Sequence, residues 1–93
     1  MRIFRLRGVI DHNNVRDTFA LPSHALAREP RLALDLSAVT GIDTAALAAL
    51  VKLMAEARRL GGEVRLTAAS KAVRSALELT RLDGLFPISA QTA

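Results

Sequence analysis

The chain has no cysteine, tyrosine or tryptophan among its 93 residues. Without cysteine, the sequence excludes disulfides, thiol catalysis and sulfur-ligated metals. Three phenylalanines are the only aromatic residues, so Leu, Ala, Val and Ile must form the core, and the stacking platform of many single-strand-binding proteins is missing. No apolar run approaches the roughly 20 residues of a membrane span, and the first residues lack the apolar segment of a signal peptide. We therefore expect a cytoplasmic protein that does not insert into a membrane.

The charge is basic but dispersed. Thirteen Lys and Arg against nine Asp and Glu give a net charge of +4, and 51% of the residues are hydrophobic. This balance is typical of one small globular domain, here residues 1–93. The arginines gather only in short groups, at Arg2, Arg5 and Arg7 and at Arg58-Arg59, and no stretch carries five like charges. Such a pattern indicates a solvated surface, with no nucleic-acid partner.

Hydrophobic periodicity predicts alternating strands and helices. Residues 2–10 alternate as a half-buried strand does. The run 32–36 is continuously apolar and is expected to be a central strand, and residues 44–60 repeat with helical spacing before Gly61-Gly62. The remaining elements are a helix from Val15 to Leu26 with Pro22 inside it, a strand with Val64, Leu66 and Ala68, a helix after Ser70, and a short edge strand at 85–88. The expected fold is α/β, a single-layer, mostly parallel four-stranded sheet with packed helices.

Residues at the carboxyl ends of the strands are the candidates for function, because functional loops of parallel sheets gather there. In this chain they are Asp11-His12, residues 39–44 and residues 68–71. Thr44 is the most informative of them, since it lies where the longest helix is expected to begin. Free N–H groups and the helix dipole favour negative charge at that end, so a phosphate added to its hydroxyl would be held there. The same residues would also serve a plain helix cap.

The sequence offers little evidence of a catalytic or metal-binding group of residues. His12 and His24 are the only histidines, and their spacing is that of no metal site. The chain has no glycine-rich phosphate loop. Asp35 and Asp43 could form a carboxylate pair across one loop, but no nucleophile or acid partner accompanies them. The simpler interpretation is a strand-end Asp35 and a helix-capping Asp43. We expect a protein that is not an enzyme and has no metal or cofactor.

Four segments together resemble the STAS domain family. The run from Leu34-Asp35-Leu36-Ser37 to Ile42-Asp43-Thr44-Ala45-Ala46-Leu47 is similar to its central motif, in which Asp-Ser or Asp-Thr opens a helix. Residues 8–12 resemble the turn after its first long strand. Residues 61–66 are similar to the Gly-Gly start of its next strand. Residues 70–73 and 82–86 match its final helix and Gly-Leu-Phe exit. The four segments occur in the family's order along nearly the whole chain.

In bacterial anti-sigma-factor antagonists of this family, a partner kinase of GHKL type phosphorylates the hydroxyl residue after the motif Asp. That kinase is also the anti-sigma factor, and phosphorylation releases it. The resemblance therefore implies a phosphorylation site at Thr44 and a regulator of transcription. The implied partner-binding surface comprises Asp11, His12, Asp43, Thr44, Ala45, Ala46 and Leu47.

Two alternatives stay open. The Asp43-Thr44 pair also resembles the STAS subunit of phospholipid-trafficking ABC transporters of the Mla type, which docks on an ATPase. A nucleotide-binding module is the other alternative, and the missing phosphate loop counts against it. The family pattern has Gly two positions after the hydroxyl residue, whereas this chain has Ala46. The Gly84-Leu85-Phe86 exit favours the antagonist.

Overall fold

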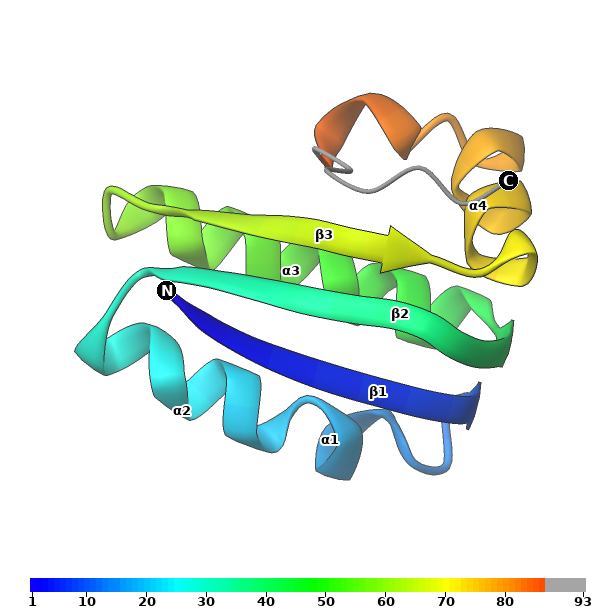
Figure 1. Cartoon of the computed structure of the whole chain (residues 1–93), viewed down its shortest axis with the longest axis horizontal. Helices are drawn as coiled ribbons and strands as arrows, with labels where there is room; N and C mark the ends of the chain where they lie inside the picture. The colour runs from blue at the N-terminus through cyan, green and yellow to red at the C-terminus, as the bar shows by residue number, and fades with distance from the viewer. Residues whose placement is uncertain (87–93) are drawn as a thin grey trace.

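A computed structural model describes residues 1–86 of the chain. Within these residues, each of three strands is followed by helix, as the periodicity predicts (Figure 1). The elements are β1 (Arg2–Ile10), α1 (Val15–Thr18), α2 (Ala20–Arg28), β2 (Arg31–Ile42), α3 (Thr44–Arg59), β3 (Glu63–Ala69), α4 (Lys71–Leu79) and a 3₁₀ helix η1 (Asp83–Leu85). The prediction of an α/β fold is confirmed.

The sheet has the order β1-β2-β3, and both of its pairings are parallel. The predicted central position of residues 32–36 is confirmed, because β2 lies between the other two strands. However, β2 continues through the residues expected to form a loop and ends only at Ile42. Its last residues pair with β1 alone, as far as Ile10 opposite Ile42.

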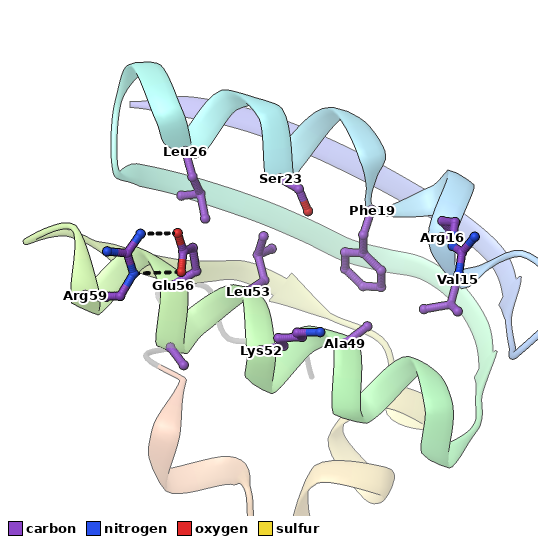
Figure 2. A pocket seen from close by; sticks show the side chains of 11 residues that line it. Val15, Arg16, Phe19, Ser23, Leu26, Ala49, Lys52, Leu53, Glu56 and Arg59 are labelled. Atoms are coloured by element: carbon purple, nitrogen blue, oxygen red, sulfur yellow. Dashed lines mark hydrogen bonds and ion pairs between the residues drawn. The ribbon is translucent and has the colours of Figure 1, made fainter.

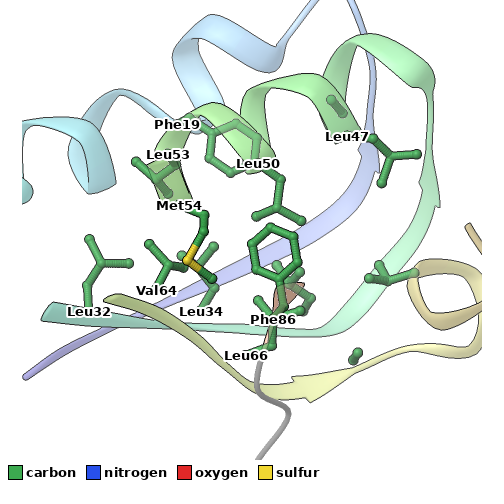
Figure 3. Packing of buried hydrophobic residues seen from close by; sticks show 14 of the residues in the cluster. Phe19, Leu32, Leu34, Leu47, Leu50, Leu53, Met54, Val64, Leu66 and Phe86 are labelled. Atoms are coloured by element: carbon green, nitrogen blue, oxygen red, sulfur yellow. The ribbon is translucent and has the colours of Figure 1, made fainter. Parts of the chain in front are cut away.

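The prediction of four strands is wrong for the described chain, since residues 1–86 contain three. Leu85 belongs to η1, and Pro87 and Ile88 of the expected edge strand lie outside the described residues. Phe86 is 2% exposed. Its ring lies between α3 and β3 (Figure 3), so the residue after η1 contributes an apolar side chain to the core.

The core lies between α3 and one face of the sheet (Figure 3). Leu50 and Met54 of α3 are buried there, as predicted, whereas Val51 is only partly buried. The sheet contributes a layer of side chains that are 0–1% exposed: Leu32, Leu34, Leu36, Val64 and Leu66. Leucine and valine at period-two positions thus bury one side of β2 and of β3 against the helix.

The opposite side of the sheet, called the open face below, carries Ile3, Arg5, Arg7 and Val9 of β1. Ile3 is 66% exposed and Val9 is 56% exposed. Figure 1 looks onto this face, and α3 lies behind the sheet. Within residues 1–86, no helix covers it. Parallel sheets are usually buried on both sides, whereas β1 exposes apolar Ile3 and Val9 as well as Arg5 and Arg7 on this face.

The predicted first helix is divided at Phe19 into α1 and α2. Pro22 has no N–H and therefore cannot donate to the carbonyl of Thr18, which would continue a single helix. In the first turn of α2, by contrast, a proline is tolerated because those N–H groups lack helical partners. The break leaves Phe19 6% exposed, with its ring directed toward α3 (Figure 2).

The turn between α3 and β3 requires both of its glycines. Gly61 has φ +87°, a conformation that side chains with a Cβ rarely adopt. A Cβ on Gly62 would collide with the backbone carbonyl of Pro30. The backbone of Glu63 donates to that same carbonyl at 3.0 Å, so the turn is fastened to the start of β2.

Candidate partner-binding site at the start of helix α3

The ends of β1 and β2 meet where α3 begins. The backbone N–H of Asp43 donates to the carbonyl of Ile10 at 3.2 Å, so the chain leaves both strands at the same level. This brings Asp11 and His12, which follow β1, beside Asp43 and Thr44, which follow β2. His12 and Asp43 are 31 residues apart in the sequence, and the parallel pairing of the strands brings them together.

Asp43 is the N-cap of α3. Its Oδ1 accepts from the backbone N–H of Ala46 at 2.9 Å, the bond that defines a side-chain cap. Its Oδ2 accepts from the backbone N–H of His12 at 2.9 Å and lies 3.4 Å from His12 Nδ1. The hydrogen bond from Ala46, with those from His12, lowers the pKa of the Asp43 carboxyl. The predicted capping role of Asp43 is thereby confirmed, and the cap also joins α3 to β1.

Thr44 is the first residue of α3, and its side chain is exposed. Its hydroxyl makes no hydrogen bond to any residue from 1 to 86, since the carboxylate of Asp43 already caps the helix. The backbone N–H groups of Thr44 and Ala45 likewise have no acceptor in that range. A free hydroxyl therefore stands next to two free donors at the positive end of a 16-residue helix.

The turn after β1 is held by Asp11 and Asn14. Asp11 Oδ1 accepts from the backbone N–H of Asn13 at 2.9 Å, and Asn14 Oδ1 accepts from the backbone N–H of Asp11 at 2.9 Å. The amide of Asn14 also donates to the carbonyl of Val9 at 2.8 Å. Our sequence interpretation did not assign Asn14 a role in the site. The Asp-x-x-Asn spacing, in which both residue types favour such turns, is the signal that could have found it.

Three residues of the expected surface have other environments. Ala46 is 0% exposed and Leu47 is 6% exposed, so both side chains lie in the core. Ala45 is half-buried. Thr44 is therefore the residue whose side chain is exposed at the start of α3, and Asp43 and the Asp11-His12 turn surround it.

Strand β3 does not reach the level of the carboxyl end of β2, contrary to our expectation. The backbone N–H of Ser70 donates to the carbonyl of Leu36 at 3.2 Å, well before the end of β2 at Ile42. Residues 68–71 thus adjoin the middle of β2, and α4 packs against that strand. The carboxyl ends of β1 and β2 form the site by themselves.

The possible carboxylate pair of Asp35 and Asp43 is wrong. Asp35 lies within β2 and forms an ion pair with Arg5 of the open face at 3.2 Å. Hydrogen bonds from the hydroxyl and the backbone N–H of Ser37, at 2.6 and 3.0 Å, lower the pKa of its carboxyl. The two aspartates serve different segments. Residues 1–86 hold no group of three His, Asp or Glu side chains placed to bind a metal, and none of the helices described there is long and apolar enough to cross a membrane.

The family model of the STAS domain matches residues 1–93. The chain belongs to the STAS domain family. Solved structures with the same fold include the anti-sigma factor antagonist SpoIIAA in its unphosphorylated form. That protein is 20% identical, with a TM-score of 0.78, and the match covers 96% of this chain and 79% of SpoIIAA.

Two further structures share this STAS fold. A protein of Thermotoga maritima (tm1081), described as a candidate anti-sigma factor antagonist, is 23% identical with a TM-score of 0.84, and 96% of this chain covers 78% of it. An anti-sigma factor antagonist from Mycobacterium paratuberculosis is 24% identical with a TM-score of 0.78, with coverage of 96% and 76%. Among curated proteins, no sequence matches the chain.

Proposed function

We propose that this STAS domain is a protein-interaction module of the anti-sigma factor antagonist type, and that phosphorylation of Thr44 switches it. The observation that carries the proposal is the free hydroxyl of Thr44 at an exposed helix start whose cap is supplied by its neighbour Asp43. The partner we propose is an anti-sigma factor that is also a serine/threonine kinase of GHKL type. Three structures with this fold are described as antagonists or candidate antagonists of anti-sigma factors.

The chemistry of the site is suited to such a switch. Phosphorylation adds about −1.5 to −2 charges and three acceptor oxygens. The free N–H groups of Thr44 and Ala45 and the helix dipole would stabilise these oxygens in the unbound domain. In a docked complex the same charge would lie in the interface beside the carboxylate of Asp43, where it must be desolvated. Phosphorylation therefore preserves the fold and opposes the complex.

The alanine at position 46 is compatible with this surface. Because Ala46 is 0% exposed, its methyl group packs inward and adds nothing to the outer surface of α3. The residues that we propose to contact the partner are Asp11, His12, Asp43 and Thr44, together with the half-buried Ala45 in the first turn of α3.

The test combines phosphorylation with binding. The protein is incubated with ATP and a GHKL-type kinase encoded beside it, and the modified residue is mapped by mass spectrometry. We expect phosphate on Thr44, its loss in Thr44→Ala, and binding of Thr44→Ala close to that of the native protein. Thr44→Glu should weaken binding at least tenfold. Phosphate on Ser37 or Thr40, or on no residue, would contradict the proposal.

Lys71→Glu is the matched control, because it places Glu at the first position of α4. It should leave binding within twofold although it changes the net charge more. Binding to the ATPase of a phospholipid-trafficking ABC transporter that is indifferent to Thr44→Glu would assign the domain to such a transporter instead.

A further inference from the structure

A groove of about 640 Å³ lies between the α1–α2 segment and α3 (Figure 2). It is on the helical side of the sheet, and neither Asp43 nor Thr44 lines it. Pockets that bind small organic molecules commonly have volumes of about 300–1,000 Å³. The groove therefore has the size of a ligand site that is separate from the proposed partner surface.

The interior of the groove is apolar. Phe19 and Leu26 reach into it from the α1–α2 segment, and Leu53 reaches into it from α3 (Figure 2). Ser23 and Ala49 are small residues on the two sides of the groove, so the facing helix surfaces are not bridged there by large side chains. Phe19, Leu26 and Leu53 are only 2–6% exposed and form the floor of the groove. The apolar surface that an alkyl chain or aromatic ring could remove from water therefore lies mainly on the half-buried Ala49 and the exposed Ala55 of α3.

Cations line the edge of the groove. At one end Glu56 neutralises Arg59 through two hydrogen bonds of 3.0 and 2.6 Å, and Arg59 lowers the pKa of Glu56. Arg16, near the opposite end, and Lys52 also line the groove, and neither forms an ion pair within residues 1–86. Two uncompensated positive charges thus flank an apolar interior, an arrangement complementary to an anion.

We propose that this groove binds a small amphipathic anion. Its apolar body lies against Phe19 and Leu53, and its carboxylate lies near Arg16 and Lys52. A medium-chain fatty acid has both parts. The neutralised Glu56–Arg59 pair at the far end leaves the tail without a charged partner, so the anion binds with its head toward Arg16.

The experiment is a titration of the whole protein with dodecanoate, below the concentration at which it forms micelles, followed by ¹⁵N NMR and calorimetry. We expect saturable binding at one site, with the largest amide shifts in α2 and in the middle of α3. Butyrate, which lacks the tail, and dodecyltrimethylammonium, which has the opposite head charge, should each bind at least tenfold more weakly.

Substitutions locate the site. Ala49→Trp fills the groove and should weaken binding at least tenfold; Ser23→Phe is the second filling variant if the first does not fold. Lys52→Glu and Arg16→Glu should each weaken binding about fivefold. Arg7→Glu, the matched charge control on the open face, should change it less than twofold.

Three results would overturn the proposal. The first is dodecanoate binding that Arg7→Glu weakens as much as Lys52→Glu does, because the attraction would then come from net charge alone. The second is equal binding of the cationic amphiphile. The third is amide shifts from dodecanoate that lie outside the groove, or no shifts at all. If an amphipathic helical peptide then occupies the groove, the groove would be assigned to a protein segment. None of these results depends on phosphorylation of Thr44.

Discussion

Helices α3 and α4 begin in the same way but differ in the residues around their caps. Each follows a parallel strand, and each has a side-chain N-cap that accepts from the backbone N–H three residues later. Asp43 bonds Ala46 at 2.9 Å, and Ser70 bonds Val73 at 3.2 Å. At α3 the cap is a carboxylate that also accepts from His12 of another segment, and at α4 it is a neutral hydroxyl.

The next residue makes the difference functional. At α4 the first helical residue is Lys71, whereas at α3 it is Thr44, which has an exposed hydroxyl without a partner in the described chain. Since both helices are capped by the preceding residue, neither first position is needed for helix stability. A reactive group at the start of α3 is therefore available for modification at little cost to the fold, and α4 serves as an internal control.

The largest effect that we predict concerns the core beneath α3. Leu50 is 0% exposed, so Leu50→Ala should lower the free energy of unfolding by about 2–5 kcal/mol, through lost burial and the cavity left behind. The same substitution at Leu79 of α4, which is 85% exposed, should change it by less than about 0.5 kcal/mol. Urea denaturation measures both. Similar values for the two variants would show that the buried side of α3 is misassigned.

The cap of α4 gives the next effect. Ser70→Ala removes the acceptor for the N–H of Val73 and should lower the free energy of unfolding by about 1 kcal/mol. Ser75→Ala, at an exposed position inside the same helix, should leave stability unchanged or slightly raise it, because alanine favours helices more than serine does. Equal losses from the two substitutions would mean that Ser70 does not act as a cap.

Most of the fold followed from periodicity, and the errors in the bounds and buried positions of β2 and β3 fall at bulges. Between Arg5 and Arg7 of β1, the partner strand advances three residues, from Asp35 to Ala38. An extra residue of this kind breaks the alternation of buried side chains, so residues 37–42 no longer resembled a strand in the sequence. Likewise Leu34 to Asp35 faces Leu66 to Ala68 on β3, and the buried residue is Ala69 where alternation predicted Ala68.

The candidate site was predictable only in part. Parallel strands end at one edge of a sheet, and this rule alone was sufficient to place His12 near Asp43. The position of Ser70 beside Leu36, and not beside the end of β2, was not predictable, because it follows from the extra length of β2. The groove between α2 and α3 depends on how far apart two helices pack, and no local pattern around Ser23 or Ala49 records that spacing.

Acid should distinguish the charged cap from the neutral one. The pKa of Asp43 is lowered from its ordinary value of 3.8, so its charge stabilises the fold above that value and the stabilisation is lost as the pH falls through the lowered pKa. Asp43→Asn retains an acceptor for Ala46 but has no charge. The native protein should thus be more stable than this variant at about pH 6, and the difference should shrink toward about pH 2.

Chemical denaturation across that pH range measures this difference. Asp35, whose pKa is also lowered, contributes equally to both proteins and cancels. Ser70→Asn provides the comparison at α4, where the difference from the native protein should not depend on pH in this range. A constant difference for Asp43→Asn would contradict the charged role of the cap.

The smallest effect is the most informative about function. Thr44→Ala removes a hydroxyl that has no hydrogen-bond partner in the described chain, and alanine has the higher helix propensity. The free energy of unfolding should therefore stay within about 0.5 kcal/mol of the native value, as it should for Lys71→Ala at the same position of α4. Urea denaturation of both variants checks this. A loss near about 1 kcal/mol for Thr44→Ala alone would identify the hydroxyl as part of the cap. Stability would then account for threonine at this position, and the proposed switch would lose the observation that carries it.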